Sequence, residues 1–263
     1  MVTAPLRLGV VSYLNAEPLV YGLAGDQGVV LERDLPSRVA ARLSAGELDL
    51  AMIPTAAYAD GDYAIVPGVA IASRGPVRSV RVYHRGDLAS VRRVALDTSS
   101  RTSVVLARVL LHDLLGRDPE YVPAAPDVEG MLAAADAALV IGDPALYDEG
   151  DRPWLDLGAE WTRRTGLPFV YAFWAGPAGA TSPAQVARLQ AALQDGVANV
   201  ARIAASYNGH GAGRAALNES YLRANIHYAF GSEEQAGVRE FYRRAYDLRL
   251  IPRVPDLRFH ADR

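Results

Sequence analysis

Short apolar runs alternate with helix-like stretches along the first half of this 263-residue chain, and this alternation restricts the fold more than any other feature. Residues 6–12 and 48–53 are apolar runs typical of buried strands, whereas residues 16–23 and 36–45 have helical patterns. Gly46 follows the second helical pattern, as is common at a helix C-terminus. Because strands that alternate with helices usually pair in parallel, we expect an α/β fold with a mostly parallel sheet.

A second alternating set follows, and we expect it to form a second lobe. Strands are predicted at residues 91–96, 121–124 and 137–141, helices at 101–115 and 128–135, and a largely helical region after residue 182. Extended runs at 83–86 and 173–176 are predicted to cross between the lobes. Residues 1–83 and 177–263 would then form one lobe and residues 84–176 the other, with a ligand cleft between them.

Hydroxyl side chains crowd one predicted strand-to-helix turn, Thr98-Ser99-Ser100-Arg101-Thr102-Ser103. The N-terminus of a helix offers free backbone N–H groups and the positive end of the helix dipole. A helix cap needs only one of these hydroxyls. We therefore predict a carboxylate-binding site in which Ser100, Thr102 and Ser103 contact the ligand and the guanidinium of Arg101 holds it. Asp97, just before the turn, is either a general base or a brace for it.

Three other predicted strand ends carry polar groups, at Ser12-Tyr13-Leu14-Asn15, Pro54-Thr55 and Gly142-Asp143. Ligands of open α/β sheets bind where such ends converge, so we expect Ser12, Tyr13, Thr55, Gly142 and Asp143 to contact substrate. Considered singly, these residues also have structural interpretations. Asn15 could cap a helix, and Thr55 could be an ordinary residue at a strand end. The same holds for Ser79, which lies inside an extended run.

The composition excludes several kinds of chemistry. The absence of Cys excludes disulfides, thiolate nucleophiles and Cys-ligated metals. All 27 basic residues are Arg, which excludes Schiff-base formation on Lys and the P-loop lysine. The five histidines form no metal-binding pair such as H-E-x-x-H, and we find no glycine-rich dinucleotide motif. We therefore predict neither a metal nor a cofactor.

Charge and hydropathy also limit the expected partners and location. The net charge of −3 and the scattered arginines give no basis for a nucleic-acid partner, whereas a small dicarboxylate remains compatible. No secretion signature and no apolar stretch of membrane-spanning length is found, so we expect a cytoplasmic protein without a membrane partner. The sequence does not predict the oligomeric state.

Several motifs resemble those of the menaquinone-biosynthesis chorismate dehydratases of the futalosine route. They occur in order across residues 6–175: Val11-Ser12-Tyr13-Leu14-Asn15-Ala16-Glu17-Pro18-Leu19, Gly46-Glu47-Leu48-Asp49-Leu50-Ala51, Gly75-Pro76-Val77-Arg78-Ser79-Val80, Thr98-Ser99-Ser100-Arg101-Thr102-Ser103 and Ile141-Gly142-Asp143. The resemblance implies a two-lobed fold like the type II periplasmic solute-binding proteins. It also implies cofactor-independent dehydration of chorismate to 3-[(1-carboxyvinyl)oxy]benzoate, with Asn15 and Ser79 at the positions of the family's functional Asn and Ser.

Two alternatives stay open beside this interpretation. One is a non-catalytic solute-binding protein of the same fold, although the chain shows neither the expected signal nor a lipoprotein Cys. The other is the sister enzyme that forms a dihydroxynaphthoate later in the pathway, although its N-terminal signature is not found here. For the dehydratase, an amide such as Asn15 is too weak a base to accept the ring proton, and the substrate's own side-chain carboxylate is a candidate acceptor.

Overall fold

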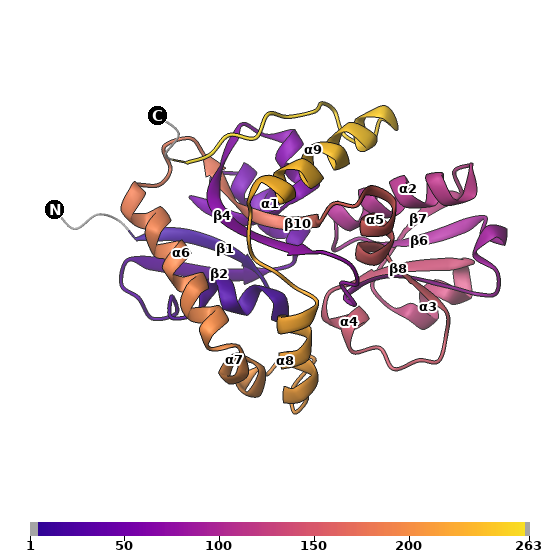
Figure 1. Ribbon diagram of the computed structural model, residues 1–263, viewed down its shortest axis with the longest axis horizontal. Coiled ribbons are helices and arrows are strands. Elements are labelled where there is room, and N and C mark those ends of the chain that lie inside the picture. Colours follow the sequence, from indigo (N-terminus) through magenta and orange to yellow (C-terminus); the bar gives the residue numbers. More distant parts are fainter. Residues whose placement is uncertain (1–4, 261–263) are drawn as a thin grey trace.

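Two five-stranded sheets organise the computed structural model, which describes residues 5–260 (Figure 1). The first sheet has the order β2-β1-β3-β10-β4 and the second β7-β6-β8-β5-β9. The strands are β1 (Leu6–Val11), β2 (Val29–Asp34), β3 (Leu50–Pro54), β4 (Tyr63–Ser73), β5 (Val80–His84), β6 (Arg93–Asp97), β7 (Glu120–Ala124), β8 (Ala137–Ile141), β9 (Trp154–Asp156) and β10 (Phe169–Pro177). Each sheet lies in its own lobe, so the predicted two-lobed α/β class is confirmed.

The two sheets share one pattern of strand directions. In the first, β2, β1 and β3 are parallel, and β10 runs antiparallel to both β3 and β4. In the second, β7, β6 and β8 are parallel, and β5 runs antiparallel to both β8 and β9. The strand that opposes the others, β5 or β10, is in each case the first one formed after the chain enters that sheet from the other lobe.

The crossings differ from those that the sequence predicts. The chain leaves the first sheet after β4 and enters the second at β5, and it returns between β9 and β10, so the connections are residues 74–79 and 157–168. The predicted crossing 83–86 instead lies at the end of β5, and 173–176 lies within β10. An apolar extended run has the same pattern whether it crosses between sheets or pairs within one, which is why the prediction misplaced both crossings. The division of the chain into domains of residues 1–83 with 177–263 and residues 84–176 stays a prediction.

Helices cover both sheets and complete the first lobe from the C-terminal part of the chain (Figure 1). The longer helices are α1 (Pro36–Ser44), α2 (Thr102–Leu115), α3 (Val128–Ala134), α5 (Leu157–Thr165), α6 (Pro183–Ala198), α7 (Val200–Ser206), α8 (Ala215–Ala224) and α9 (Ser232–Asp247). Shorter ones are η1 (Leu14–Val20), η2 (Thr55–Asp60), η3 (Leu88–Ser90) and α4 (Asp143–Leu146). Pro18 lies inside η1, where it removes a backbone donor. No helix among residues 5–260 is long and apolar enough to cross a membrane.

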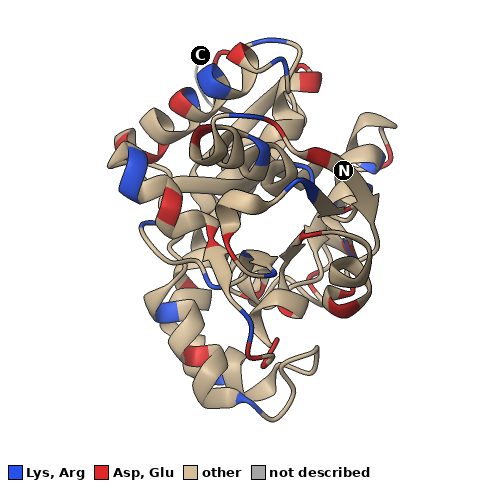
Figure 2. Ribbon diagram, turned by 90° about the vertical axis from the view of Figure 1, so that its right-hand side faces the viewer, with Lys and Arg blue, Asp and Glu red and all other residues tan. Residues whose placement is uncertain are grey.

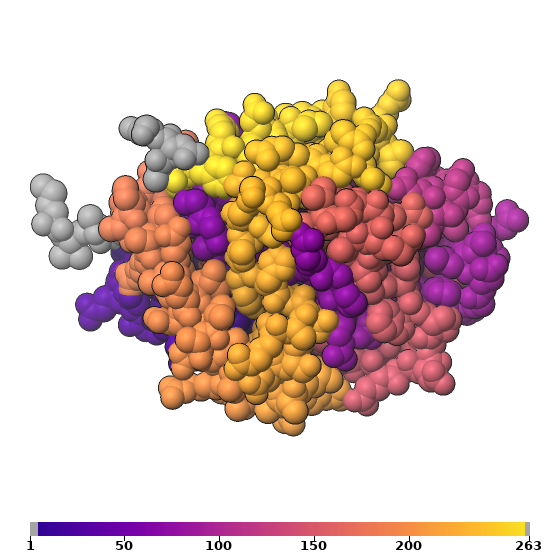
Figure 3. All heavy atoms as spheres, in the orientation of Figure 1, coloured from indigo at the N-terminus to yellow at the C-terminus, as the bar shows by residue number. Residues whose placement is uncertain are grey.

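The C-terminal segment packs against the first crossing. In Figure 3 the gold atoms of this segment lie against the purple atoms of residues that lead from β4 to β5. The Asn225 side chain donates a 2.9 Å hydrogen bond to the Pro76 carbonyl, and Arg74 forms an ion pair with Glu233 at 2.5 Å. Residues of the C-terminal part of the chain, Asn225 and Glu233, therefore fix the first connection between the lobes.

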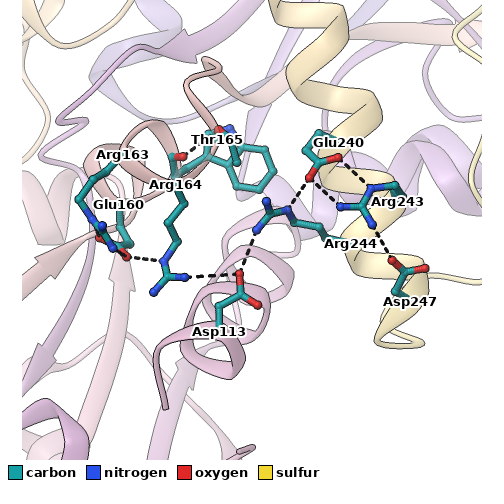
Figure 4. A network of polar contacts seen from close by, with 10 residues as sticks. Asp113, Glu160, Arg163, Arg164, Thr165, Glu240, Arg243, Arg244 and Asp247 are labelled. Carbon is teal, nitrogen blue, oxygen red and sulfur yellow. Dashed lines mark hydrogen bonds and ion pairs between the residues drawn. The ribbon is translucent and has the colours of Figure 1, made fainter. Parts of the chain in front are cut away.

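Charged residues of both signs are interspersed over the elements, and one network joins the lobes (Figures 2 and 4). Asp113 of α2 accepts a 2.9 Å hydrogen bond from Arg244 of α9 and lies 3.8 Å from the Arg164 guanidinium of α5. Arg244 also donates to Glu240, at 2.6 Å. Because these groups are partly exposed, each pair contributes modestly to stability, and the network mainly fixes where α9 meets α2.

Candidate active site

A small cavity of about 60 Å³ lies between the two lobes. Its wall combines the ends of β1 and β3, the first crossing, the starts of α1 and α2, the end of β8 and part of β10. The lining residues are Val11, Tyr13, Asn15, Pro36, Pro54, Ile71, Val77, Ser79, Val80, Ser100, Thr102, Ser103, Ile141, Gly142, Tyr171 and Ala172. Among residues 5–260, no side chain that lines the cavity carries a formal charge.

The structure brings most of the predicted site residues into this wall. They are Tyr13, Asn15, Ser79, Ser100, Thr102, Ser103 and Gly142. Asn15 and Ser79 lie 64 positions apart in the sequence (79 − 15) but share one cavity, because β1 ends in the first lobe where the first crossing passes. The structure therefore supplies the proximity that the sequence alone does not.

Asn15 does not cap the helix in which it lies. The N-cap residue of η1 is Tyr13, and Asn15 is the second helical residue. Its side-chain oxygen is buried and has no hydrogen-bond partner among residues 5–260. An unpaired buried amide oxygen costs roughly 1–3 kcal/mol, so its presence here requires an explanation. The alternative in which Asn15 only caps a helix is not what the structure shows, because the cap position belongs to Tyr13.

Hydrogen bonds hold both the side chain and the backbone of Ser79. Its hydroxyl oxygen lies 2.8 Å from the phenol oxygen of Tyr221, and its carbonyl accepts a 2.8 Å hydrogen bond from the Gly142 N–H. Just before it, the N–H groups of Val77 and Arg78 donate to the two Asp156 carboxylate oxygens, at 3.0 and 2.7 Å. Arg78 has a φ of +63°, an uncommon conformation for a residue with a side chain, so the surrounding contacts must hold this turn in place.

The hydroxyl-rich turn is built on Asp97. The Asp97 carboxylate accepts hydrogen bonds from the Ser99 N–H at 2.8 Å, the Ser99 hydroxyl at 2.6 Å and the Ile141 N–H at 3.3 Å. Asp97 is fully buried and does not line the cavity, and burial raises its pKa. Of the two roles considered for Asp97, the brace is therefore the one its contacts support.

Beyond this brace, the turn contacts its own helix and the other lobe. Ser100 accepts a 3.2 Å hydrogen bond from the Ser103 N–H, which caps the first turn of α2. Thr102 accepts a 3.1 Å hydrogen bond from the Ala56 N–H across the lobe boundary. The hydroxyl groups of this turn therefore serve both capping and contact between lobes, and their side chains also face the cavity.

Arg101 is not at the cavity. Its guanidinium pairs with Asp60 at the end of η2 and lines a separate groove with Ser44 and Tyr63. Residues on either side of Arg101 face the cavity, whereas its own side chain points out of the turn, nearly half exposed. The sequence predicts the turn, but it does not show that the Arg101 side chain points away from the cavity. The predicted carboxylate anchor therefore lies outside this site.

Three more predicted residues lie outside the wall. Ser12 is exposed and its hydroxyl is 3.5 Å from the Asp34 carbonyl, so it faces a different groove. Thr55 is buried and donates to the Val170 carbonyl at 2.8 Å, which joins β10 to the end of β3. Asp143 accepts from the Leu14 N–H at 3.2 Å and from the Tyr207 hydroxyl, so it links the lobes beside the cavity. Burial raises the Asp143 pKa.

Apart from Tyr13, the sequence does not predict the tyrosines around the cavity. Tyr171 lines the wall and places its hydroxyl 2.9 Å from that of Ser73. Tyr221 contacts Ser79, and Tyr207 contacts Asp143, both from the helical C-terminal region. A buried tyrosine hydroxyl usually has a partner, which is the one signal the sequence offered, but it does not say which partner.

With this geometry in place, the comparisons with known proteins decide the family. Residues 6–247 match the sequence model of a family described as menaquinone biosynthesis. The chain belongs to this family. A chorismate dehydratase from Thermus thermophilus is 30% identical to it over an alignment of 258 positions, and the alignment covers 90% of this chain and 94% of that protein. The family resemblance indicated by the sequence motifs is therefore confirmed.

Solved structures confirm the fold of this menaquinone-biosynthesis family member. A protein from Archaeoglobus fulgidus has a TM-score of 0.72 at 16% identity, with 95% of this chain and 100% of that chain covered. A Candida albicans gene product, described as exhibiting the generic periplasmic binding protein structural fold, has a TM-score of 0.59 at 12% identity, with coverages of 98% and 99%. At these identities the matches show the architecture and nothing about the ligand.

Proposed function

We propose that this protein dehydrates chorismate to 3-[(1-carboxyvinyl)oxy]benzoate. The observation that carries the proposal is the unpaired, buried amide oxygen of Asn15, which lines the same interlobe cavity as Ser79. The 30% identity to a chorismate dehydratase over nearly the whole chain supports this choice among reactions of the family. The proposal requires the cavity to bind a dianion, position it and assist the loss of water.

Neutral donors would hold the two carboxylates of the substrate. The described wall contains no Arg or His, but the start of α2 contributes Ser100, Thr102 and Ser103 to it. Hydroxyls and N–H groups at the N-terminus of a 14-residue helix favour an anion without a formal positive charge. The apolar side chains of Val77 and Ile141 would contact the substrate ring.

The size of the cavity implies that the lobes move during the cycle. A volume of about 60 Å³ is well below the roughly 300–1,000 Å³ typical of small-molecule sites. Chorismate would therefore enter when the lobes are further apart, and closure would exclude water and align the reacting groups. On this proposal, the contacts that bridge the lobes, such as Asp143 with the Leu14 N–H, would break when the lobes separate.

The reaction breaks the ring C–H bond beside the ether and the C–O bond of the neighbouring hydroxyl. The proton and the hydroxyl leave as water, and the ring becomes aromatic. Asn15 can donate a hydrogen bond to the departing hydroxyl or to the negative charge that develops on the ring carboxylate. Since no carboxylate or imidazole lines the described wall, the proposed proton acceptor is the substrate's own side-chain carboxylate.

Incubation of the purified protein with chorismate tests the proposal directly. We expect chorismate to disappear and the aromatic enol ether to accumulate, as detected by mass spectrometry, and an Asn15→Asp sample provides the matched control. Binding of chorismate without conversion would instead support the solute-binding alternative. Absence of both binding and conversion would overturn the proposal and favour the sister reaction.

A further inference from the structure

Tyr221 lies immediately behind the cavity wall. It comes from α8, in the C-terminal part of the first lobe, and its side chain is fully buried. Its phenol oxygen is 2.8 Å from the hydroxyl oxygen of Ser79, and Tyr221 itself does not line the cavity. This tyrosine therefore contacts a proposed catalytic residue from the side opposite to the substrate.

The phenol of Tyr221 stays protonated at neutral pH, because burial raises its pKa. A hydroxyl has one proton to donate and two lone pairs to accept with. If Tyr221 donates its proton to the Ser79 oxygen, the proton of Ser79 is free to point into the cavity.

The helix that carries Tyr221 is fixed from two directions. Asn218, one turn earlier on α8, is completely buried, and its amide donates to the carbonyls of Ala204 and Gly211 at 3.1 and 3.0 Å. Its side-chain oxygen accepts a 2.7 Å hydrogen bond from Tyr147, which follows α4 in the second lobe. The position of the phenol is therefore set by contacts from both lobes.

We propose that Tyr221 is a positioning residue for the dehydration: its hydroxyl orients the Ser79 hydroxyl. This inference rests on the proposed function, because it assigns Tyr221 a role in that reaction. It explains why a polar group is buried at this place although it does not face the cavity. A tyrosine with a purely structural role would contribute to stability without affecting turnover.

The test compares Tyr221→Phe with Tyr58→Phe. Tyr58 is equally buried, and its hydroxyl donates to the Tyr63 and Asp256 carbonyls, away from the cavity. We expect Tyr221→Phe to lower kcat for chorismate by about tenfold with little change in KM, since one hydrogen bond to a catalytic group is lost. Tyr58→Phe should lower the melting temperature to a similar extent and leave kcat unchanged.

Tyr221→Phe combined with Ser79→Ala tests whether Tyr221 acts through Ser79 or independently of it. In the Ser79→Ala background, where the group to be oriented is absent, Tyr221→Phe should reduce the residual rate by far less than tenfold. A full tenfold loss in that background would overturn the role through Ser79. If Tyr221→Phe alone folds poorly, the comparison in the Ser79→Ala background still tests the proposal, because removing both hydroxyls leaves neither one unpaired.

The two proposals fail in different ways. A parent protein that leaves chorismate unchanged overturns the proposed function and the role of Tyr221 with it. An active parent whose Tyr221→Phe variant has the same kcat overturns only the inference about Tyr221.

Discussion

The ring of Tyr13 lies so close to Gly142 that a Cβ atom on residue 142 would be 2.7 Å from it. Gly142 also has a φ of +69° with a ψ of −147°, a conformation that essentially only glycine adopts. The two residues come from different lobes and both line the cavity. A side chain at residue 142 would therefore strain the backbone and push against the opposite lobe at the same time.

We expect Gly142→Ala to lose stability by ~1–3 kcal/mol and to lose most of its activity. Gly166→Ala is the control for a positive φ without crowding, because Gly166 has a φ of +71° with a ψ of 0°, the left-handed helical region, and open space around it. The control should show a smaller loss of stability, measured by urea unfolding, with unchanged turnover. Equal stability and activity in the two variants would show that the contact with Tyr13 has no role.

Asn15→Ala should differ from the loss of a helix cap. A lost cap costs ~1 kcal/mol, but Asn15 is not the N-cap residue and its side-chain oxygen has no partner among the described residues. We therefore expect unchanged or slightly increased thermal stability together with a loss of chorismate turnover. Melting temperature and chorismate consumption should be measured on the same samples. An active Asn15→Ala protein would remove Asn15 from the proposed mechanism.

Arg101→Lys should have almost no effect on turnover. The guanidinium of Arg101 pairs with Asp60 at the surface rather than facing the cavity, and an exposed pair of this kind contributes ~0–1 kcal/mol to stability. The KM for chorismate should stay within about twofold of the parent value. A tenfold rise in KM would mean that Arg101 reaches the substrate when the lobes are apart.

Glu240 should make stability depend on pH in the acid range. Hydrogen bonds from Arg243, then Arg244, lower the pKa of Glu240 to about 2. Because the folded protein lowers this pKa, the contribution is fully present above the ordinary pKa of a glutamate, about 4.3, and is lost as the pH falls toward 2. Glu240→Gln should therefore be less stable than the parent at pH 7, and the difference should shrink between about pH 5 and 2.

Urea unfolding of both proteins across this pH range checks the prediction. Glu149→Gln is a suitable control, because Glu149 pairs with Arg214 but its side chain is 78% exposed. Its stability difference from the parent should be small at every pH. A Glu240→Gln difference that does not change with pH would contradict the assignment.

The hydroxyl turn shows what the sequence can and cannot determine about this site. Local spacing predicts Ser100, Thr102 and Ser103 at the start of a helix, and the structure places them there, along the wall of the interlobe cavity. The direction of Arg101 depends on Asp60, which is 41 residues away, and no local pattern contains that information. The contact of Tyr221 with Ser79 spans 142 residues and depends on how α8 packs, so it too required the structure.

The same limit applies to the strands. Buried strands such as β3 and β8 are continuous apolar runs and were predicted close to their observed positions. The strand β2 was missed because it is an edge strand that ends in Glu32, Arg33 and Asp34 and is only partly buried. The strand β9 has three residues at the edge of the second sheet, too few for a periodic signal.

The chain enters and leaves the second sheet on neighbouring strands, since Arg81 of β5, its first strand, pairs with Asp156 of β9, its last. The two connections to the first lobe also touch, because the Gly75 N–H donates a 2.9 Å hydrogen bond to the Thr162 hydroxyl. If the lobes move apart as proposed above, they would turn about this one line of contact, and no strand pair within either sheet would have to break. The free energy of that opening would then depend on the contacts between the lobes, such as Thr102 with the Ala56 N–H, so single substitutions at the boundary would change it while both sheets stay intact.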